Sequence, residues 1–549
     1  MLELPQRSFR AGAILIALAV CTSACSSTRT PQAANGTRHA WTQAHVLRIG
    51  DIADPDTLNE YLSGMDLVDQ IGSLIFSTLV TADPQGRLTG DLAEVVPSVS
   101  NGGISSDGKT IVYHLRPRVR WQDGFPLTSR DVKFSWSEVM NPDNPVEHRE
   151  GYDQVESIDT PSDTTVVVHL KRRDPPFVTQ FFTSIQEGPK GILPRHLLAK
   201  FPNLNHLPYN AAPIGSGPFK VARWERGQRV ILTRNSAYFR GFPKLQTIDF
   251  DIYPNSSTLV TEMQTHAVDL IVDADFAHYP EYTQIPEAKV LVGPSNVLSI
   301  LAINDKKHGL NDVNVRRAIA MSIDYDSVIR KLVHGLGDRA RDIVPPGALG
   351  YTANDPYRYD PAAANALLDR MGWKRGIDGV RARGGTRLDF DFSGVIGQGT
   401  SRSLGILLQQ DLRVIGVRLS IKDYVNTILF APDGPLWKGT YDLAAYGDWL
   451  PVDPDNHFYL ACDQFTPRGM NNHFFCDPKV DALEQAGLST NDPAARASIY
   501  HRAELLIHDD VAYIPLYLWR RVYVANADLR DFQPTRTIVP WYEIWKTDI

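Results

Sequence analysis

Apolar and polar residues follow two different periods along this chain, and the two periods predict a mixture of strands and helices. Alternation at every second residue, typical of half-buried strands, occurs at residues 47–51 and 110–115. Apolar residues three to four positions apart, typical of amphipathic helices, occur at residues 128–140 and 312–329. The part of the chain before Asn304 is rich in predicted strands, whereas the part beyond it is rich in predicted helices.

Several helices in the second part begin with the same chemical signal. Asp-Pro pairs at residues 360–361, 477–478 and 492–493 place a carboxylate at the N-cap and a proline at the first helical position. Short apolar segments typical of strands lie among these helices, at residues 388–392, 417–421, 443–446 and 512–518. Strands and helices interspersed in this way indicate an α/β fold.

Length and composition describe an ordinary globular protein with more than one core. A chain of 549 residues is too long for one hydrophobic core, so two or more lobes are expected. The hydrophobic content of 43% and the charged content of 22% are usual for folded proteins. The net charge of -7 argues against a nucleic-acid partner, because phosphate binding needs a basic face.

The first residues have the pattern of a signal peptide. Arg7 and Arg10 precede an apolar run at residues 11–20, which is too short to span a bilayer. We therefore expect residues 1–24 to be removed on export and residues 25–44 to form a polar tether.

A lipid anchor is expected at Cys25. The sequence Thr22-Ser23-Ala24-Cys25 resembles a bacterial lipobox, in which the cysteine is lipidated and becomes the mature N-terminus, although Thr22 replaces the usual Leu, Val or Ile. Cys21 is a weaker candidate because Val20 is large for the cleavage position, and simple secretion with Cys25 unmodified is the alternative. With the anchor, the protein is exported and held at the outer face of the cell membrane.

Two further cysteines, Cys462 and Cys476, are expected to form a disulfide. An exported protein occupies a compartment that permits disulfides, and two remaining cysteines allow a single pairing. The alternative is a metal site that combines them with His457 or His473, but the spacing fits no zinc pattern.

One apparent nucleotide motif is rejected on its context. Residues 103–110 match the phosphate-binding pattern G-x-x-x-x-G-K-[ST], which works only where a helix follows the loop. Here the residues after the loop alternate as a strand, and Asp107-Gly108 is a hairpin-turn pair.

Enzyme signatures are absent from the sequence. It contains no H-E-x-x-H and no G-x-S-x-G motif, and no cysteine is left for nucleophilic use. We expect no catalytic residues, no metal site and no resident cofactor, and an exported hydrolase is the less favoured alternative.

The stretch 441–476 combines the features expected of a small-ligand site. It begins as an apolar strand, passes into a loop rich in Trp, Asp and Pro, and continues between the two cysteines. Aromatic rings and carboxylates at the end of a strand are typical of places where proteins bind small molecules.

A series of short motifs, in order and spacing, resembles the family 5 solute-binding proteins of ABC importers, the peptide- and nickel-binding group. The resemblance runs from about residue 47 to residue 518. The motifs include Leu92-Ala93-Glu94, Asp107-Gly108-Lys109-Thr110, Trp121-Gln122-Asp123-Gly124, Ile214-Gly215-Ser216-Gly217-Pro218-Phe219, Arg234-Asn235, Val315-Arg316-Arg317-Ala318, Tyr359-Asp360-Pro361, Gly372-Trp373 and Asp453-Pro454.

The resemblance implies a two-lobed periplasmic-binding-protein type II (Venus flytrap) fold with an extra subdomain in the first lobe. Lobe I is expected at residues 45–297 and 515–549, with the inserted subdomain at residues 76–213, and lobe II at residues 298–514. Hinged closure around a ligand would let a permease distinguish loaded from empty protein. Monomers are usual in the family.

The resemblance also implies a set of ligand-binding residues on the two walls of the cleft. The first-lobe wall contains Ala53 and Asp54. The second-lobe wall is formed by Tyr446, Gly447, Asp448, Trp449, Leu450 and Asp453. Asp453 also has a structural interpretation, because Asp-Pro favours turns.

Leu450 departs from the family pattern. Members that bind free peptides have a carboxylate at this position, three residues before the Asp-Pro pair, which binds the peptide ammonium group. A leucine leaves a buried ammonium unpaired, which is costly. Either Asp448 reaches the ligand from two residues earlier, or the ligand is not held by its amino terminus.

The expected function is therefore that of a lipid-anchored receptor that delivers di- to oligopeptides to an ABC permease. Haem or a nickel chelate is the alternative ligand, since Trp449 to Pro454 also resembles the nickel-binding branch. A non-transport regulatory lipoprotein is a further alternative.

Overall fold

A computed structural model describes residues 38–146, 149, 151–185, 190–344, 346, 348–351, 357–396, 399–431, 433–450, 453–490, 492–537 and 539–549. The chain divides into two units, residues 1–40 and 41–549, and all elements named below belong to the second. The predicted signal peptide and Cys25 lie outside the described residues. In the described part, no helix has both the length and the apolar character needed to cross a bilayer.

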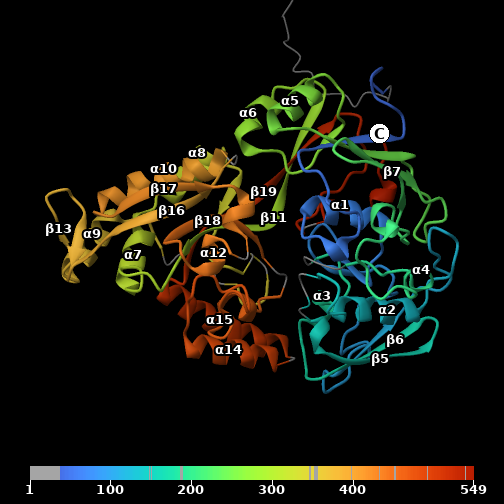
Figure 1. Ribbon diagram of the computed structural model, residues 1–549, viewed down its shortest axis with the longest axis horizontal. Helices are drawn as coiled ribbons and strands as arrows, with labels where there is room; N and C mark the ends of the chain where they lie inside the picture. Colours follow the sequence, from blue (N-terminus) through green and yellow to red (C-terminus); the bar gives the residue numbers. More distant parts are fainter. Residues whose placement is uncertain are drawn as a thin grey trace, which may run out of the picture. The chain divides into compact units, whose positions relative to one another are not determined.

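One mixed sheet of eleven strands runs through the second unit (Figure 1). In spatial order its strands are β17 (Arg418–Tyr424), β16 (Asp389–Val395), β18 (Leu443–Trp449), β11 (Ala288–Ile303), β19 (Tyr513–Asn526), β10 (Leu270–Ile271), β1 (Val46–Asp51), β9 (Thr247–Ile252), β8 (Arg229–Arg234) and β7 (Phe219–Glu225), with β12 (Gly337–Arg339) paired to β19. The first-half strand predicted at residues 47–51 is β1, and those predicted at 388–392 and 417–421 are β16 and β17.

Two long antiparallel strands, β11 and β19, connect the halves of this sheet. They pair from Ala288 opposite Asn526 to Ala302 opposite Tyr513, and they lie side by side in Figure 1. At one end β19 also pairs with β10, and at the other β11 pairs with β18. Because they run through both halves of the sheet, β11 and β19 are called the crossover strands below.

The strand predicted at residues 512–518 is longer in the structure than the sequence suggested. β19 continues past the arginine pair at 520 and 521 to Asn526. The side chain of Arg521 is 3% exposed and donates from Nε to Asp273 Oδ1 at 2.6 Å. A paired charge of this kind is compatible with a buried strand.

A smaller antiparallel sheet belongs to the first half of the chain. It has the order β4 (Thr110–His114), β6 (Thr165–Leu170), β5 (Val155–Ser162), and helix α2 (Ser129–Met140) packs against it. Thr128 caps α2, in a capping box in which its N–H donates to Asp131 Oδ2 at 2.7 Å. Thr110 begins β4 rather than a helix, so the phosphate-binding pattern has the context of a hairpin turn.

The helices of the second half begin where the sequence placed their caps. Asp360, Asp477 and Asp492 each accept a hydrogen bond from a backbone N–H in the first turn of the helix that follows, α9 (Pro361–Arg370), α14 (Pro478–Leu488) or α15 (Pro493–Asp510). The single helix predicted from Asp312 to Ile329 is wrong. The structure has α7 (Val313–Ser322) and α8 (Tyr325–Leu332), and Asp324 caps the second by accepting from Ser327 N at 2.9 Å.

The remaining elements are short or cover the main sheet. They are α1 (Asp66–Ile75), α3 (Phe177–Gln180), α4 (Arg195–Leu198), α5 (Ser256–Gln264), α6 (Tyr279–Tyr282), α10 (Gly399–Val414), α11 (Asn426–Leu429), α12 (Pro435–Lys438), α13 (His457–Leu460), β2 (Val80–Ala82), β3 (Leu88–Gly90), β13 (Lys374–Arg375), β14 (Arg381–Arg383) and β15 (Thr386–Arg387).

Separate hydrophobic cores support the two halves of the sheet. One core includes Leu47 of β1 and Phe219 of β7, and the other includes Phe390 of β16 and Leu419 of β17. A third and smaller cluster forms where β11, β19, α13 and the segment after β12 meet. This third cluster surrounds the candidate site.

Candidate functional site

A pocket that is partly open to solvent lies beside the crossover strands, with about 430 Å³ of empty space that includes the open solvent at its mouth. The lining residues come from β11, β18, β19, α13 and the segments that flank them: Leu298, Ile300, Ile343, Asp448, Leu450, Asn456, Tyr459, Leu460, His473 and Tyr513.

Strand pairing between β11 and β18 places a carboxylate among apolar side chains. Leu298 and Ile300 lie on one face of β11 because side chains alternate along a strand. Asp448 of β18 lies directly opposite Leu298 in the register. The N–H of Leu450 then donates to the carbonyl of Asn296 at 2.8 Å, so pairing continues just beyond the strand.

Two further polar side chains in the lining are uncharged at neutral pH. Burial lowers the pKa of His473 to about 4, which keeps its imidazole neutral. Burial, and then the negative charges of Glu504 and Asp342, raise the pKa of Tyr513 well above its usual value. The two rings lie 5.4 Å apart between centroids. Of the described lining residues, Asp448 supplies the carboxylate.

Asn456 connects the pocket to buried carboxylates behind it. Its side chain donates to Glu504 Oε1 at 3.1 Å, and its backbone N–H donates to Glu484 Oε2 at 3.1 Å. Burial is the main cause that raises the pKa of both glutamates well above the ordinary range. The wall of the pocket therefore rests on a buried polar network.

Of the residues predicted to bind ligand, Asp448 and Leu450 line the pocket together. Tyr446 is not among the described lining residues, and its hydroxyl donates to Asn472 Oδ1 at 3.0 Å. Gly447 lies opposite Ser299 of β11. The backbone of Trp449 ends β18, but its side chain is outside the described part of the structure.

Asp453 has a structural partner in this conformation. Its two carboxylate oxygens each accept a hydrogen bond from Arg496 of α15 at 2.7 Å. Burial alone would lower the pKa of Arg496, but the hydrogen bonds and charge of Asp453 outweigh burial and raise it. Asp453 is not among the described lining residues of the pocket.

Ala53 and Asp54 lie in the loop after β1, in the other half of the sheet. The N–H of Ala53 donates to Asp51 Oδ1 at 2.8 Å. Asp54 is exposed and accepts from the N–H of Gly227, in the turn between β7 and β8, at 3.2 Å. Neither residue contributes to the described lining of the pocket.

The structure joins Cys462 and Cys476 in a disulfide, as the cysteine count predicted. The bond closes the segment that contains His473, so it braces one side of the pocket. His457, the other histidine considered as a metal ligand, instead lies 3.7 Å from Asp463 Oδ1.

Sequence patterns missed most of the apolar lining. Leu298, Ile300 and Tyr513 lie in strands whose local sequence predicts only that these residues are buried. Which residues they contact depends on how the strands pair, and the local sequence does not specify that pairing. Ile343 follows β12 with no pattern that marks it. Asn456 and His473, in contrast, lie inside the stretch 441–476 that the sequence singled out.

The fold agrees with a family comparison. Residues 88–468 match the model of the bacterial extracellular solute-binding proteins, family 5. The chain belongs to this family. The solute-binding protein is 25% identical to the oligopeptide-binding protein AppA of Bacillus subtilis over 514 residues, which cover 92% of both chains.

The names of other relatives refer to different ligands. The dipeptide-binding protein of Escherichia coli is 27% identical over 477 residues, covering 82% of this chain and 84% of the relative. The structure of NikZ from Campylobacter jejuni in complex with Ni(L-His) is 25% identical, has a TM-score of 0.77, and is matched over 91% of this chain and 100% of that chain. This solute-binding protein therefore has the two-lobed type II fold of the family, and the relatives named here are binding proteins.

Proposed function

We propose that this solute-binding protein captures a peptide, or a ligand of similar size, in its interlobe cleft and delivers it to an ABC permease. Residues 45–297 and 515–549 form lobe I in this proposal, with the insertion at 76–213, and residues 298–514 form lobe II. A lipid on Cys25 holds the protein, which acts as a monomer, at the outer face of the cell membrane.

The observation that carries the proposal is the pocket at the β11–β18 pair. Family membership supports a solute-binding role, and the lining supports the kind of solute. Leu298, Ile300 and Leu460 suit an apolar side chain, while Asp448 suits a cationic group. A peptide with a free amino terminus and an apolar residue offers both.

In this proposal Asp448 replaces the carboxylate that peptide-binding members of the family have at the position of Leu450. Both residues line the pocket, and Asp448 lies two positions earlier on the same chain segment. A buried ammonium needs an anionic partner, and a charge-assisted hydrogen bond is the strongest that a side chain can offer it.

A thermal-shift screen tests the proposal. Di- to pentapeptides with free amino termini should raise the Tm of the purified protein, and the same peptides with acetylated amino termini are the matched control. Ligand at about a hundred times its Kd adds about 2.7 kcal/mol of stability, which gives a measurable shift. Equal stabilisation by free and acetylated peptides would contradict the role of Asp448, and no stabilisation by any peptide would contradict the peptide ligand.

A nickel chelate or haem is the second candidate ligand. It is favoured by the Trp-x-Pro-x-Asp-Pro sequence at residues 449–454 and by the similarity to NikZ. The same screen with nickel–histidine and with haem separates the candidates. Stabilisation by one of these compounds, together with none by peptides, would replace the peptide proposal.

The lipid anchor has its own test. Mass spectrometry of the protein from membranes should find a diacylglyceryl group on an N-terminal Cys25, and Cys25→Ala should release the protein from the membrane fraction. An unmodified Cys25 in protein recovered from the medium would instead support simple secretion.

A further inference from the structure

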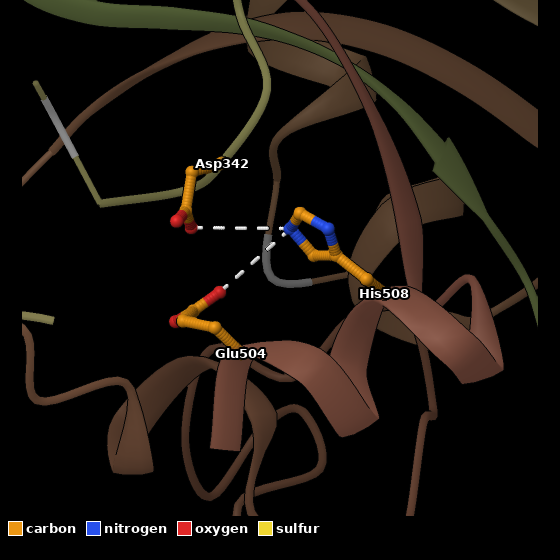
Figure 2. Close-up of side chains that lie close together, drawn as sticks. All are labelled: Asp342, Glu504 and His508. Atoms are coloured by element: carbon orange, nitrogen blue, oxygen red, sulfur yellow. Dashed lines mark ion pairs between the residues drawn. The ribbon is translucent and has the colours of Figure 1, made fainter. Parts of the chain in front are cut away.

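Three side chains of the kinds that bind metal ions converge in a buried region next to the pocket. Figure 2 shows Glu504 and His508 on one helix, α15, with Asp342 approaching from the segment after β12. Glu504 and His508 are four residues apart, so they lie on the same face of the helix. The side chains of Asp342 and Glu504 are 0% exposed and that of His508 is 7% exposed.

The spacing of their donor atoms is close to that of a metal site. His508 Nε2 lies 3.9 Å from Asp342 Oδ1 and 4.0 Å from Glu504 Oε2, and the three atoms all lie within 4.8 Å of one another. An ion at the centre of such a triangle lies roughly 2.3–2.5 Å from each donor, against about 2.0–2.2 Å for zinc bound by His and carboxylates. Inward shifts of a few tenths of an ångström by the three side chains would bring their donor atoms to the distances of a zinc site.

The two carboxylates each accept a second hydrogen bond, as carboxylate ligands in metal sites generally do. Glu504 Oε1 accepts from Asn456, which leaves Oε2 directed at the triangle. Asp342 Oδ1 accepts from the N–H of Val344 at 3.1 Å. The ring of Tyr357 packs on that of His508 with centroids 5.9 Å apart, and its hydroxyl donates to the His508 carbonyl.

A buried tyrosine near the three side chains also bears on the site. Tyr513 is close enough to Glu504 and Asp342 for their charges to act on it. Its buried hydroxyl has no hydrogen-bond partner among the described residues. A water in the fourth position of a tetrahedral ion would supply that partner.

We infer that Asp342, Glu504 and His508 form a structural binding site for a divalent first-row cation of the zinc type. The ion ties α15 to the segment that carries Ile343, and so fixes one wall of the pocket. Two carboxylates and a neutral imidazole match the charge and the ligand preference of such an ion. The site is separate from the solute and does not depend on which solute the pocket binds.

Zinc titration of the full mature protein tests the site. After dialysis against EDTA, the wild type should bind one zinc per chain by calorimetry and elemental analysis, with a higher Tm. Cobalt in place of zinc should give the absorption bands of a four-coordinate ion. Glu504→Gln keeps the acceptor for Asn456 but removes the ligand charge, and His508→Asn removes the imidazole.

Both variants should weaken zinc binding by more than the roughly 10–100-fold typical of residues that merely support ligands. The matched control is His473→Asn, which replaces another buried histidine of the same region and should keep the full zinc stoichiometry. If His508→Asn fails to fold, Glu504→Gln decides the question. The inference would be overturned if the wild type bound no zinc at micromolar free zinc, or if Glu504→Gln bound zinc with unchanged affinity. Either result would show that protons, and not a metal ion, lie between the three side chains.

Discussion

Replacing Asp453 by asparagine should destabilise the protein without weakening its ligand binding. The Asp453 and Arg496 side chains are 12% and 8% exposed and are joined by two hydrogen bonds of 2.7 Å. Breaking a buried ion pair by removing one partner costs about 3–5 kcal/mol, because the remaining charge stays buried. Arg496 keeps its bonds to the Gly487 carbonyl and to the Tyr500 hydroxyl, so we expect the lower value, about 3 kcal/mol.

Urea unfolding of Asp453→Asn and wild type measures this difference, and calorimetry of the two folded proteins measures ligand affinity. The control is Asp163→Asn, which breaks a pair with Arg130 whose side chains are 70% and 60% exposed. Exposed pairs contribute at most about 1 kcal/mol, so this variant should unfold close to the wild-type midpoint. Unchanged stability in Asp453→Asn, combined with a loss of ligand affinity, would refute the structural role and restore Asp453 as a ligand contact.

Three further outcomes follow from the same region. Replacing Cys462 and Cys476 by alanine removes a cross-link between residues 14 apart, which should lower the free energy of unfolding by about 3 kcal/mol in urea; an unchanged midpoint would contradict this. Because burial lowers the pKa of His473 to about 4, against about 6.5 when unfolded, the native state binds fewer protons, and stability should fall by about 3 kcal/mol between pH 6.5 and pH 4. His473→Asn should remove that part of the acid sensitivity, and an identical pH profile would contradict it. Leu450→Asp should raise affinity for short peptides with free amino termini and lower it for apolar or haem-like ligands, whereas an unchanged binding profile would mean that this loop does not contact the ligand.

Local chemistry made much of the fold predictable. The caps at Asp360, Asp477 and Asp492 act within a single turn, so the sequence alone located α9, α14 and α15. The break between α7 and α8 was missed because both helices bury apolar residues in the same core, which continues the three-to-four spacing across Asp324. The capping side chain of Asp324 was the signal that marked the break.

The candidate site was predictable where its residues are neighbours in sequence. Asp448 and Leu450 belong to the one stretch in which strand, aromatic residues and carboxylates coincide. Tyr513 and Ile343 reach the pocket through the pairing of β19 with β11 and with β12, which no local pattern specifies. The structural role of Asp453 could not be predicted, because its partner Arg496 lies on a helix that begins 40 residues later in the chain, at Pro493.

The affinity of wild type and Asp448→Asn for the same peptide tests the central claim most directly. The peptide is the one that stabilises the wild type most, and calorimetry gives both Kd values. A charge-assisted hydrogen bond contributes about 1.5–3 kcal/mol, so the variant should bind roughly 10–150 times more weakly. Equal affinity in the two proteins would contradict the claim that this pocket binds the ligand through Asp448.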